Sequence, residues 1–217
     1  MPPRRCLELF AGTGSIGKYC RAHGYDDVVS LDVLASAKAT HTCDILEFNY
    51  QQYPPDHFYY IHASPPCTEY STAKSIGVRN LELADHIVLK TLEIIRYFNP
   101  VIWTLENPAT GMLRHREFMR TIPYTVVDYC QFHTPEEPFL YRKRTAIWTN
   151  MASVLLKPRR LCDGKCAGIL ANEPGQRAHA VGFGGRRTEK RKMLVSKVGL
   201  ATKHRIPQKL IAWLLEE

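Results

Sequence analysis

The sequence lacks any apolar run approaching the roughly 18 residues that a membrane-spanning helix needs. Its first residues, MPPRRCLELFAG, contain no hydrophobic segment of the kind that directs secretion. Its seven cysteines are an odd number and lack the spacing of a disulfide framework. These absences argue against a membrane protein or a secreted disulfide scaffold. We therefore expect free thiols in a reducing, intracellular compartment.

Acidic residues are scarce in the second part of the chain. Residues 141–217 contain 17 Lys and Arg against 5 Asp and Glu, a net charge of +12. Residues 1–140 contain 12 against 16, a net charge of −4, and together the two parts give the overall +8. This asymmetry indicates a near-neutral body joined to a surface that binds a polyanion. A solvated basic face without a partner is the alternative.

Internal repeats are also absent, and strand-like and helix-like segments alternate over the first 150 residues. Strands are predicted at residues 6–12, 27–33, 57–64, 101–107, 124–130 and 144–150, and helices at residues 15–23 and 85–98. This alternation favours one α/β domain with a largely parallel sheet and helices on both faces. Residues 151–204 have little periodicity and predict a small, basic, loop-rich subdomain. Residues 205–217 predict a helix that begins near Pro207.

A glycine-rich turn, ELFAGTGSIG (residues 8–17), lies between the first predicted strand and helix. Glycines at this place let the backbone approach a nucleotide-like ligand, and Asp32 at the next strand end can hold ribose hydroxyls. A nicotinamide cofactor and S-adenosylmethionine fit equally well so far, and a tight turn without a ligand is the alternative. Phe10 beside the glycines, and Asp44 as an acceptor for an adenine amine, favour S-adenosylmethionine.

Three polar stretches sit at or near later predicted strand ends: SPPC with Cys67, LENP with Glu106, and YRKRTAIW with Arg142 and Arg144. A thiolate that attacks carbon 6 of a pyrimidine makes carbon 5 reactive toward a methyl sulfonium. An acid near ring nitrogen 3, and donors at the ring carbonyl, stabilise the charge that develops. Taken singly, each stretch also fits a turn with an inert thiol, an exposed acid or an ordinary basic surface.

In this order, the stretches resemble the cytosine carbon-5 methyltransferase family. ELFAGTGSIG is similar to the first family motif, SPPC to the Pro-Cys nucleophile motif and LENP to the Glu-Asn motif. LYRKR stands where the family has Gln-x-Arg-x-Arg. The similarity covers about residues 5–150. It implies a Rossmann-like, S-adenosylmethionine-dependent methyltransferase sheet for residues 1–150, with a target-recognition region at 151–204 and a C-terminal helix at 205–217 that returns to this catalytic domain.

The resemblance also implies the roles of individual residues. Cys67 is the expected covalent nucleophile and Glu106 the partner of ring nitrogen 3, while Arg142 and Arg144 steady the adduct and the base carbonyl. Family members flip the target base out of the duplex, and the loop after Cys67 corresponds to the segment that closes over it. The expected cofactor site comprises Phe10, Ala11, Gly12, Thr13, Gly14, Asp32, Val33, Asp44, Ile45 and Pro65.

The chain departs from the family pattern in several places. Leu140 replaces the usual Gln, Pro108 stands where Val is common, and the recognition region is unusually small. The terminal Gly-Asn-Ser-Val segment is missing, although RIPQKLIAWLL resembles the helix that follows it. We expect this helix to pack beside the glycine turn. The small recognition region predicts a short target sequence or a weak sequence preference, as in a compact phage, viral or bacterial enzyme.

Two groups of residues in the recognition region are candidate binding sites. The segment GGRRTEKRK suits phosphate contact through Arg186, Arg187, Lys190, Arg191 and Lys192. Cys162, Cys166 and His179 could hold a structural zinc ion, but the sequence shows no fourth ligand, and free surface thiols are the alternative.

The sequence therefore predicts a monomeric DNA cytosine carbon-5 methyltransferase that uses S-adenosylmethionine and double-stranded DNA. We expect it in the cytoplasm, nucleoid or nucleus, without a membrane association. An RNA (tRNA) cytosine carbon-5 methyltransferase is the nearest alternative, because a basic surface does not distinguish the two polymers. A catalytically silent nucleic-acid-binding relative is the other alternative, and the complete set of reactive residues argues against it.

Overall fold

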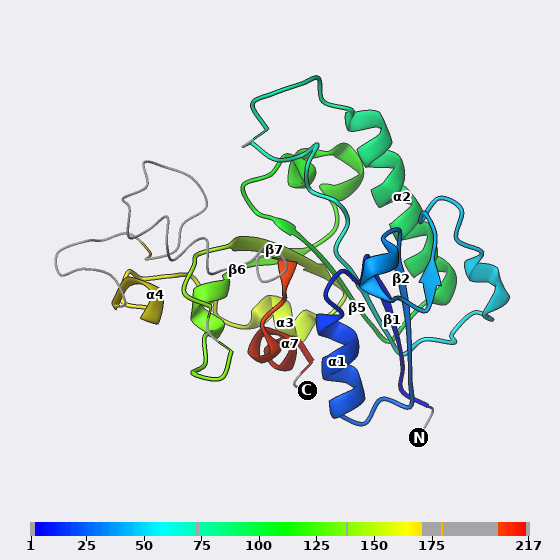
Figure 1. Cartoon of the computed structure of the whole chain (residues 1–217), viewed down its shortest axis with the longest axis horizontal. Helices are drawn as coiled ribbons and strands as arrows, with labels where there is room; N and C mark the ends of the chain where they lie inside the picture. Colours follow the sequence, from blue (N-terminus) through cyan, green and yellow to red (C-terminus); the bar gives the residue numbers. More distant parts are fainter. Residues whose placement is uncertain (1–2, 73, 138, 171–178, 180–203, 216–217) are drawn as a thin grey trace.

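The structure, a computed structural model, describes residues 3–72, 74–137, 139–170, 179 and 204–215. Within this part of the chain the strands form a seven-stranded sheet in the order β3-β2-β1-β4-β5-β7-β6 (Figure 1). The strands are β1 (Arg5–Leu9), β2 (Asp27–Asp32), β3 (His41–Thr42), β4 (Tyr60–Ala63), β5 (Ile102–Pro108), β6 (Tyr124–Asp128) and β7 (Arg144–Thr149).

The first five strands of the sheet run parallel, and β7 is antiparallel to both β5 and β6. The chain moves outward from β1 to β2 and β3, and then crosses back so that β4 pairs with the other side of β1. In open α/β sheets such a reversal leaves a crevice at the carboxyl ends of the strands, where ligands bind. The predicted Rossmann-like α/β fold is confirmed, and it brings the strand-end motifs to one edge.

Helices pack on both faces of this sheet, and the central strand β1 buries side chains on both of its sides. In β1, Cys6 packs into a hydrophobic cluster with residues of α1 and α7, whereas Leu7 and Leu9 pack into a second cluster with residues of α2. Figure 1 shows α4 far from α2, beyond β6 and β7. The α-helices among the described residues are α1 (Ser15–Ala22), α2 (Leu81–Phe98), α3 (Ala152–Leu156), α4 (Ala167–Leu170) and α7 (Gln208–Leu215). Short 3₁₀ helices occur at η1 (Ala35–Ala37), η2 (Tyr50–Gln52), η3 (Leu113–His115), η4 (Glu117–Met119) and η5 (Tyr129–Phe132).

Helix α2 begins four residues before its predicted start at residue 85. The Asn80 side chain accepts a hydrogen bond from the Leu83 N–H at 3.0 Å, which satisfies a free donor of the first turn. Asn99 ends the helix in a left-handed conformation, with φ of 42°, just before Pro100. The apolar periodicity located the body of this helix, and the Asn80 cap extends it.

The C-terminal helix α7 lies against α1 at the glycine turn. The Ile206 N–H donates to Ser15 Oγ at 3.2 Å, and the Gln208 side chain donates to the Ser15 carbonyl at 3.0 Å. Glu137 accepts from the Arg205 guanidinium and from the Gln208 N–H. The end of the chain thus supports the first turn of α1.

The basic segment expected to contact phosphates, residues 186–192, lies outside the described residues. In the part of the chain that the structure does describe, no helix is both long and apolar enough to cross a membrane.

Candidate active site

The glycine turn adopts a conformation that depends on its glycines. Gly12 and Gly14 have φ of 50° and 66°, in the region that disfavours side chains. A methyl group on Gly14 would meet no atom within 4 Å, so the turn borders open space. Phe10 also has a positive φ, 62°, which is uncommon for an aromatic residue. The turn therefore presents its backbone to a volume that a ligand can fill.

Two buried acids hold this turn in place. Asp32 accepts hydrogen bonds from the Gly12 N–H at 2.7 Å and from the Leu34 N–H at 2.8 Å. Glu8, which the sequence reasoning did not select, accepts from the N–H groups of Ile16 and Gly17 at 3.0 and 2.9 Å. Burial raises the pKa of Glu8 to about 7, against the lowering effect of these donors. The signal that marks Glu8 is its position as an acid inside an otherwise apolar strand.

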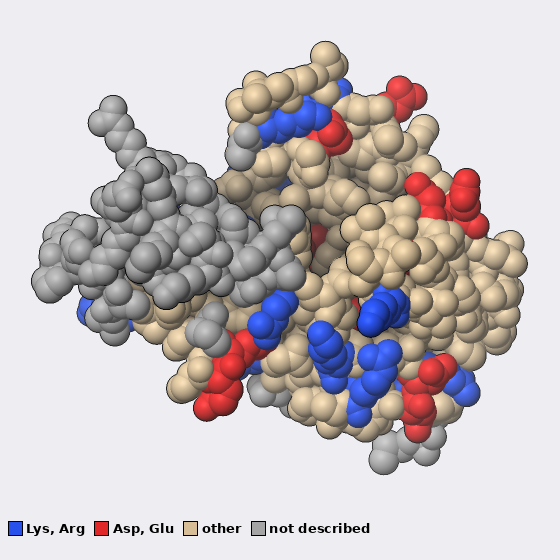
Figure 2. Space-filling model, in the orientation of Figure 1, with Lys and Arg blue, Asp and Glu red and all other residues tan. Residues whose placement is uncertain are grey.

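The other expected cofactor residues lie at the same edge of the sheet. Val33 is 63% exposed beside Asp32, although apolar side chains are commonly covered. Asp44 is exposed, and its carboxylate accepts from the Leu46 N–H at 2.9 Å. Ile45 and Pro65 are buried, so these two residues shape the edge from beneath. Figure 2 shows one hollow near the middle of this view of the surface, with acidic atoms visible inside it.

The turn that carries Cys67 is fixed from both sides. It leaves β4 through Pro65 and Pro66, whose rings restrict the backbone. Asn107, the second residue of the LENP stretch, is fully buried and donates its amide to the Pro65 carbonyl at 3.0 Å. Asn107 therefore positions the turn that carries Cys67.

Glu106 is only 5% exposed and lies in a network of two partners. The Lys143 ammonium is 2.9 Å from Glu106 Oε1, and the Tyr129 hydroxyl donates to the same oxygen at 3.3 Å. Lys143 also lies over the Tyr129 ring, 4.8 Å from its centroid. A buried carboxyl group with these partners keeps one orientation, because moving it would leave a buried charge without a partner.

The thiol of Cys67 lies within electrostatic reach of this network. Burial raises the pKa of Cys67, the Glu106 charge raises it further, and Lys143 lowers it. His62 is also nearby, and burial lowers its pKa to about 4, so its imidazole is neutral at physiological pH. His62 forms hydrogen bonds with the hydroxyls of Thr104 and Ser64 at 2.8 and 2.9 Å, and the contact with Thr104 links β4 to β5.

The two arginines of the LYRKR stretch are placed differently from Lys143. Arg144 forms a bidentate ion pair with Asp128, on the side away from Glu106. Its Nε and Nη2 atoms donate to the two carboxylate oxygens of Asp128 at 3.0 and 2.8 Å. Arg142 is exposed and forms no ion pair with the described residues. The expected contacts of both arginines with the base stay predictions. The structure instead brings Lys143 to Glu106, because successive residues of an extended segment point to opposite sides.

The loop after Cys67 has a fixed base and an exposed tip. Tyr70 is fully buried and donates to Asp85 of α2 at 2.8 Å. Glu69 forms an ion pair with Lys74 at 2.6 Å. By contrast, the side chains of Ile76 and Val78 are 87% and 94% exposed. The tip of this loop thus presents apolar groups to its surroundings.

A cluster of sulfur and nitrogen atoms lies behind the arginine stretch. The three candidate zinc ligands Cys162, Cys166 and His179 come together, and Cys130 of η5 joins them. The four ligand atoms all lie within 4.8 Å of one another. Sequence reasoning missed Cys130 because it is 32 positions before Cys162, on a different element.

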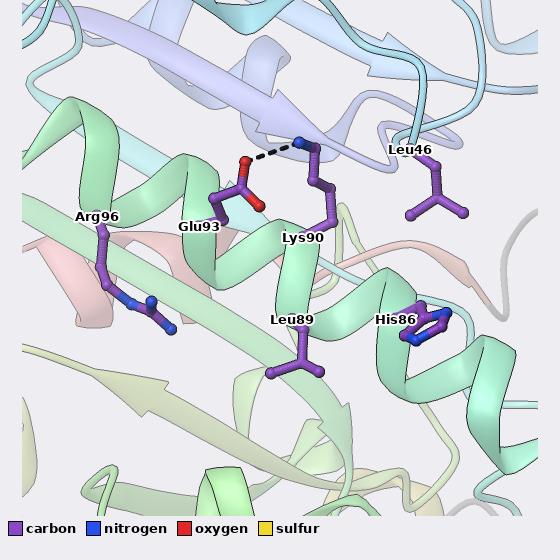
Figure 3. A pocket seen from close by; sticks show the side chains of 6 residues that line it. All are labelled: Leu46, His86, Leu89, Lys90, Glu93 and Arg96. Atoms are coloured by element: carbon purple, nitrogen blue, oxygen red, sulfur yellow. Dashed lines mark hydrogen bonds and ion pairs between the residues drawn. The ribbon is translucent and has the colours of Figure 1, made fainter.

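A separate depression of 410 Å³ lies over α2, with a polar rim and two exposed leucines (Figure 3). It is lined by Leu46, His86, Leu89, Lys90, Glu93 and Arg96. Lys90 and Glu93, one turn apart on α2, form an ion pair at 2.7 Å. It contains none of the residues of the motifs, so it is not the candidate active site.

Comparison with known proteins gives one relative that matches over its whole length. The chain is 31% identical, over 233 aligned positions, to the "Probable DNA (cytosine-5)-methyltransferase" of frog virus 3 (isolate Goorha). The match covers 98% of this chain and 99% of the viral protein. No protein-family model matches the chain.

Solved structures of two methyltransferases are also similar to the chain. A protein of E. coli described as a "putative DNA modification methyltransferase encoded within prophage" is 13% identical, with a TM-score of 0.48, and the match covers 67% of this chain and 46% of that one. The S. pombe Dnmt2 methyltransferase is 14% identical, with a TM-score of 0.45, and the match covers 74% and 53%. This chain thus spans about half the length of these two solved chains.

The strand order and the glycine turn at the carboxyl edge are those of the Rossmann-like class of α/β fold that methyltransferases share. The full-length relative makes the assignment narrower. The chain belongs to the DNA (cytosine-5)-methyltransferase family and is an enzyme of that family.

Proposed function

We propose that this enzyme transfers a methyl group from S-adenosylmethionine to carbon 5 of cytosine in DNA, through a covalent adduct between Cys67 and carbon 6. The observation that carries the proposal is the convergence of Cys67, Glu106 and Lys143 at the carboxyl edge of the sheet. An inert buried thiol needs neither a rigid two-proline turn nor a carboxylate fixed beside it. This convergence also argues against a catalytically silent relative.

The residues at the other half of the edge fit S-adenosylmethionine. The open space over Gly14 accepts the cofactor beside the backbone, and the exposed side chain of Val33 offers an apolar surface to adenine. Asp32 holds Gly12 and retains lone pairs for ribose hydroxyls. When bound, S-adenosylmethionine supplies the electrophilic methyl group.

The proposed reaction begins when the Cys67 thiolate forms a bond to carbon 6 of cytosine and the ring double bond opens toward carbon 5. Glu106, in its carboxylic acid form, donates a hydrogen bond to ring nitrogen 3, where charge accumulates, and Lys143 and Tyr129 hold its carboxyl group. Carbon 5 would then bond to the methyl group as the bond between that methyl and the sulfonium sulfur breaks, which leaves a neutral thioether. Loss of the carbon 5 proton to a base restores the double bond and expels the thiolate, so Cys67 is regenerated.

Carbon 6 is not accessible inside stacked DNA, so we propose that the target base is flipped out of the duplex. The exposed Ile76 and Val78 at the tip of the loop after Cys67 suit contact with the bases left behind. Residues 151–204, as the target-recognition region, and the basic segment 186–192 would contact the duplex. Binding should then weaken steeply between low and moderate salt, because phosphate contacts release counterions.

The test is to incubate the full chain with DNA in which 5-fluorocytosine replaces cytosine, in the presence of S-adenosylmethionine. Fluorine does not leave carbon 5 as a proton does, so the adduct should persist as a complex stable to denaturation. Cys67→Ser should form none. Methyl transfer measured in parallel on cytosine DNA and on tRNA distinguishes the polymers. Transfer to tRNA alone would overturn the DNA substrate, and no transfer to either polymer would overturn the proposed activity.

A further inference from the structure

The cluster of Cys130, Cys162, Cys166 and His179 is assembled from three separate segments of the chain. Cys130 belongs to η5 beside the sheet, Cys162 and Cys166 flank a short loop before α4, and His179 comes from the region beyond α4. Cys130 is 3% exposed and His179 is 9% exposed. Three thiols and one imidazole that meet in a shielded place make a soft donor set, the kind that selects zinc.

The three separations among Cys162, Cys166 and His179 are close to the edges of a zinc tetrahedron, and the Cys130 sulfur lies within 4.8 Å of each of these donors. Bonds of about 2.3 Å to sulfur and 2.0–2.1 Å to nitrogen give edges of about 3.8 Å between sulfurs and about 3.5 Å between sulfur and nitrogen. The Cys162 and Cys166 sulfurs are 3.6 Å apart. The His179 Nε2 atom is 3.5 Å from the Cys162 sulfur and 3.1 Å from the Cys166 sulfur.

The surroundings of the cluster are built for close packing. An added methyl group on Gly168 of α4 would lie 2.4 Å from the Leu140 carbonyl oxygen and 2.9 Å from the His179 ring. Asp128, which is fully buried, accepts from the Cys162 N–H at 2.9 Å and binds the Arg144 guanidinium. The position of Cys162 is thus fixed through its backbone, and a cation lies near the thiols.

We propose that Cys130, Cys162, Cys166 and His179 bind one structural Zn²⁺ ion, which fastens the target-recognition region to the catalytic sheet. Three thiolates and a zinc ion carry a net charge of −1. The Arg144 guanidinium, whose own charge is paired with Asp128, lies near Cys130 and Cys162 and stabilises that charge without neutralising it. A closed set of four protein ligands leaves no position for substrate, so the ion stabilises structure and does not take part in methyl transfer.

The site is joined to the active site through two pairs of neighbouring residues. Cys130 follows Tyr129, which binds Glu106, and Arg144 follows Lys143, which also binds Glu106. The Tyr129 N–H donates to the Lys143 carbonyl at 3.1 Å, so the two pairs lie side by side. The zinc ion therefore also holds the two partners of Glu106 in place.

The experiment measures metal directly and does not depend on the proposed methyl transfer. The full chain is expressed with zinc in the medium, desalted and analysed by inductively coupled plasma mass spectrometry. We expect about one equivalent of zinc in the wild type and at least a tenfold loss in Cys130→Ser. The matched control is Cys43→Ser, which alters a partly exposed cysteine outside the cluster and should retain the wild-type content.

Cobalt gives a second measurement on the unaltered chain, which remains valid if Cys130→Ser does not fold. Co²⁺ added to the metal-free wild type should produce the thiolate charge-transfer and tetrahedral bands of a sulfur-rich site, and zinc should displace it. A wild type with less than a tenth of an equivalent of zinc and no such bands would overturn the proposal. Full zinc retention in a folded Cys130→Ser variant would overturn the assignment of the fourth ligand.

Discussion

The two halves of the carboxyl edge are organised by different parts of the polypeptide. On the side of β1 and β2, the glycine turn presents its backbone, and buried Asp32 and Glu8 hold backbone N–H groups. On the side of β4, β5 and β7, side chains hold one another, as Lys143 and Tyr129 hold Glu106. A backbone site suits a cofactor that is the same in every turnover. A side-chain site suits a base whose charge changes during the reaction.

The largest effect should come from the nucleophile on the side-chain half. Cys67→Ser should lower methyl transfer by ~10³-fold or more, because the hydroxyl is a far weaker nucleophile than the thiolate. Binding of DNA and cofactor should remain, since neither depends on the thiol. The measurement is single-turnover transfer of labelled methyl groups, with Cys43→Ser as the control. A Cys67→Ser rate within tenfold of the wild type would contradict the covalent mechanism.

Glu106→Gln tests the same half in two ways. Transfer should fall by ~10²-fold or more, as for loss of an acid at the reacting ring. The pKa of Cys67 should also fall, because the Glu106 charge raises it and Lys143, which lowers it, is still present. The pH dependence of Cys67 alkylation, followed by mass spectrometry of its peptide, measures this shift. An unchanged or higher midpoint would show that the two groups do not interact as the geometry indicates.

Lys143 sharpens the comparison with its arginine neighbours. Lys143→Met should lower the rate of transfer by about 10²-fold, because Glu106 loses the donor that orients it. Lys143→Arg should recover part of the activity. The same assay on Arg142→Met measures the contact with the base that the family resemblance implies. If Lys143→Met retains the wild-type rate, the ion pair with Glu106 is not important in catalysis.

Asn107→Ala should loosen the nucleophile turn without touching the substrate. The Pro65 carbonyl loses its buried donor, which should cost about 1–3 kcal/mol in the free energy of unfolding. Urea unfolding measures this cost, and kcat should fall more than KM rises. Wild-type stability and kcat in Asn107→Ala would mean that the prolines alone position Cys67.

The smallest effect should come from the backbone half. Gly14→Ala places a methyl group in the open space and strains a left-handed residue by about 1–2 kcal/mol. It should weaken S-adenosylmethionine binding measured by calorimetry, with little change in transfer at saturating cofactor. Gly24→Ala, which has a similar positive φ of 74° and also meets no atom, is the matched control for the strain. Equal cofactor affinity in both variants would place the cofactor elsewhere.

Prediction from the sequence succeeded where a short segment contains the whole signal. The alternation of apolar segments gave the strands β1, β2, β4, β5, β6 and β7, and the glycine turn followed β1 as expected. The apolar periodicity predicts a start for α2 that is four residues late, because the first turn of the helix depends on the cap at Asn80 and not on an apolar stripe. Glu8 and Asn107 are adjacent to recognised motif residues, but their roles depend on hydrogen bonds to other segments.

The sequence by itself determined the fold class, the family and Cys67 as the candidate nucleophile, because local periodicity and the order of short motifs encode them. Only the tertiary structure decided that Lys143, between two arginines, contacts Glu106. The face of the sheet to which each side chain of an extended segment points depends on the register of that segment with β5 and β6. It alone placed Cys130 beside Cys162, Cys166 and His179. Contacts between distant segments arise from packing the whole chain, and spacing along the sequence does not record them.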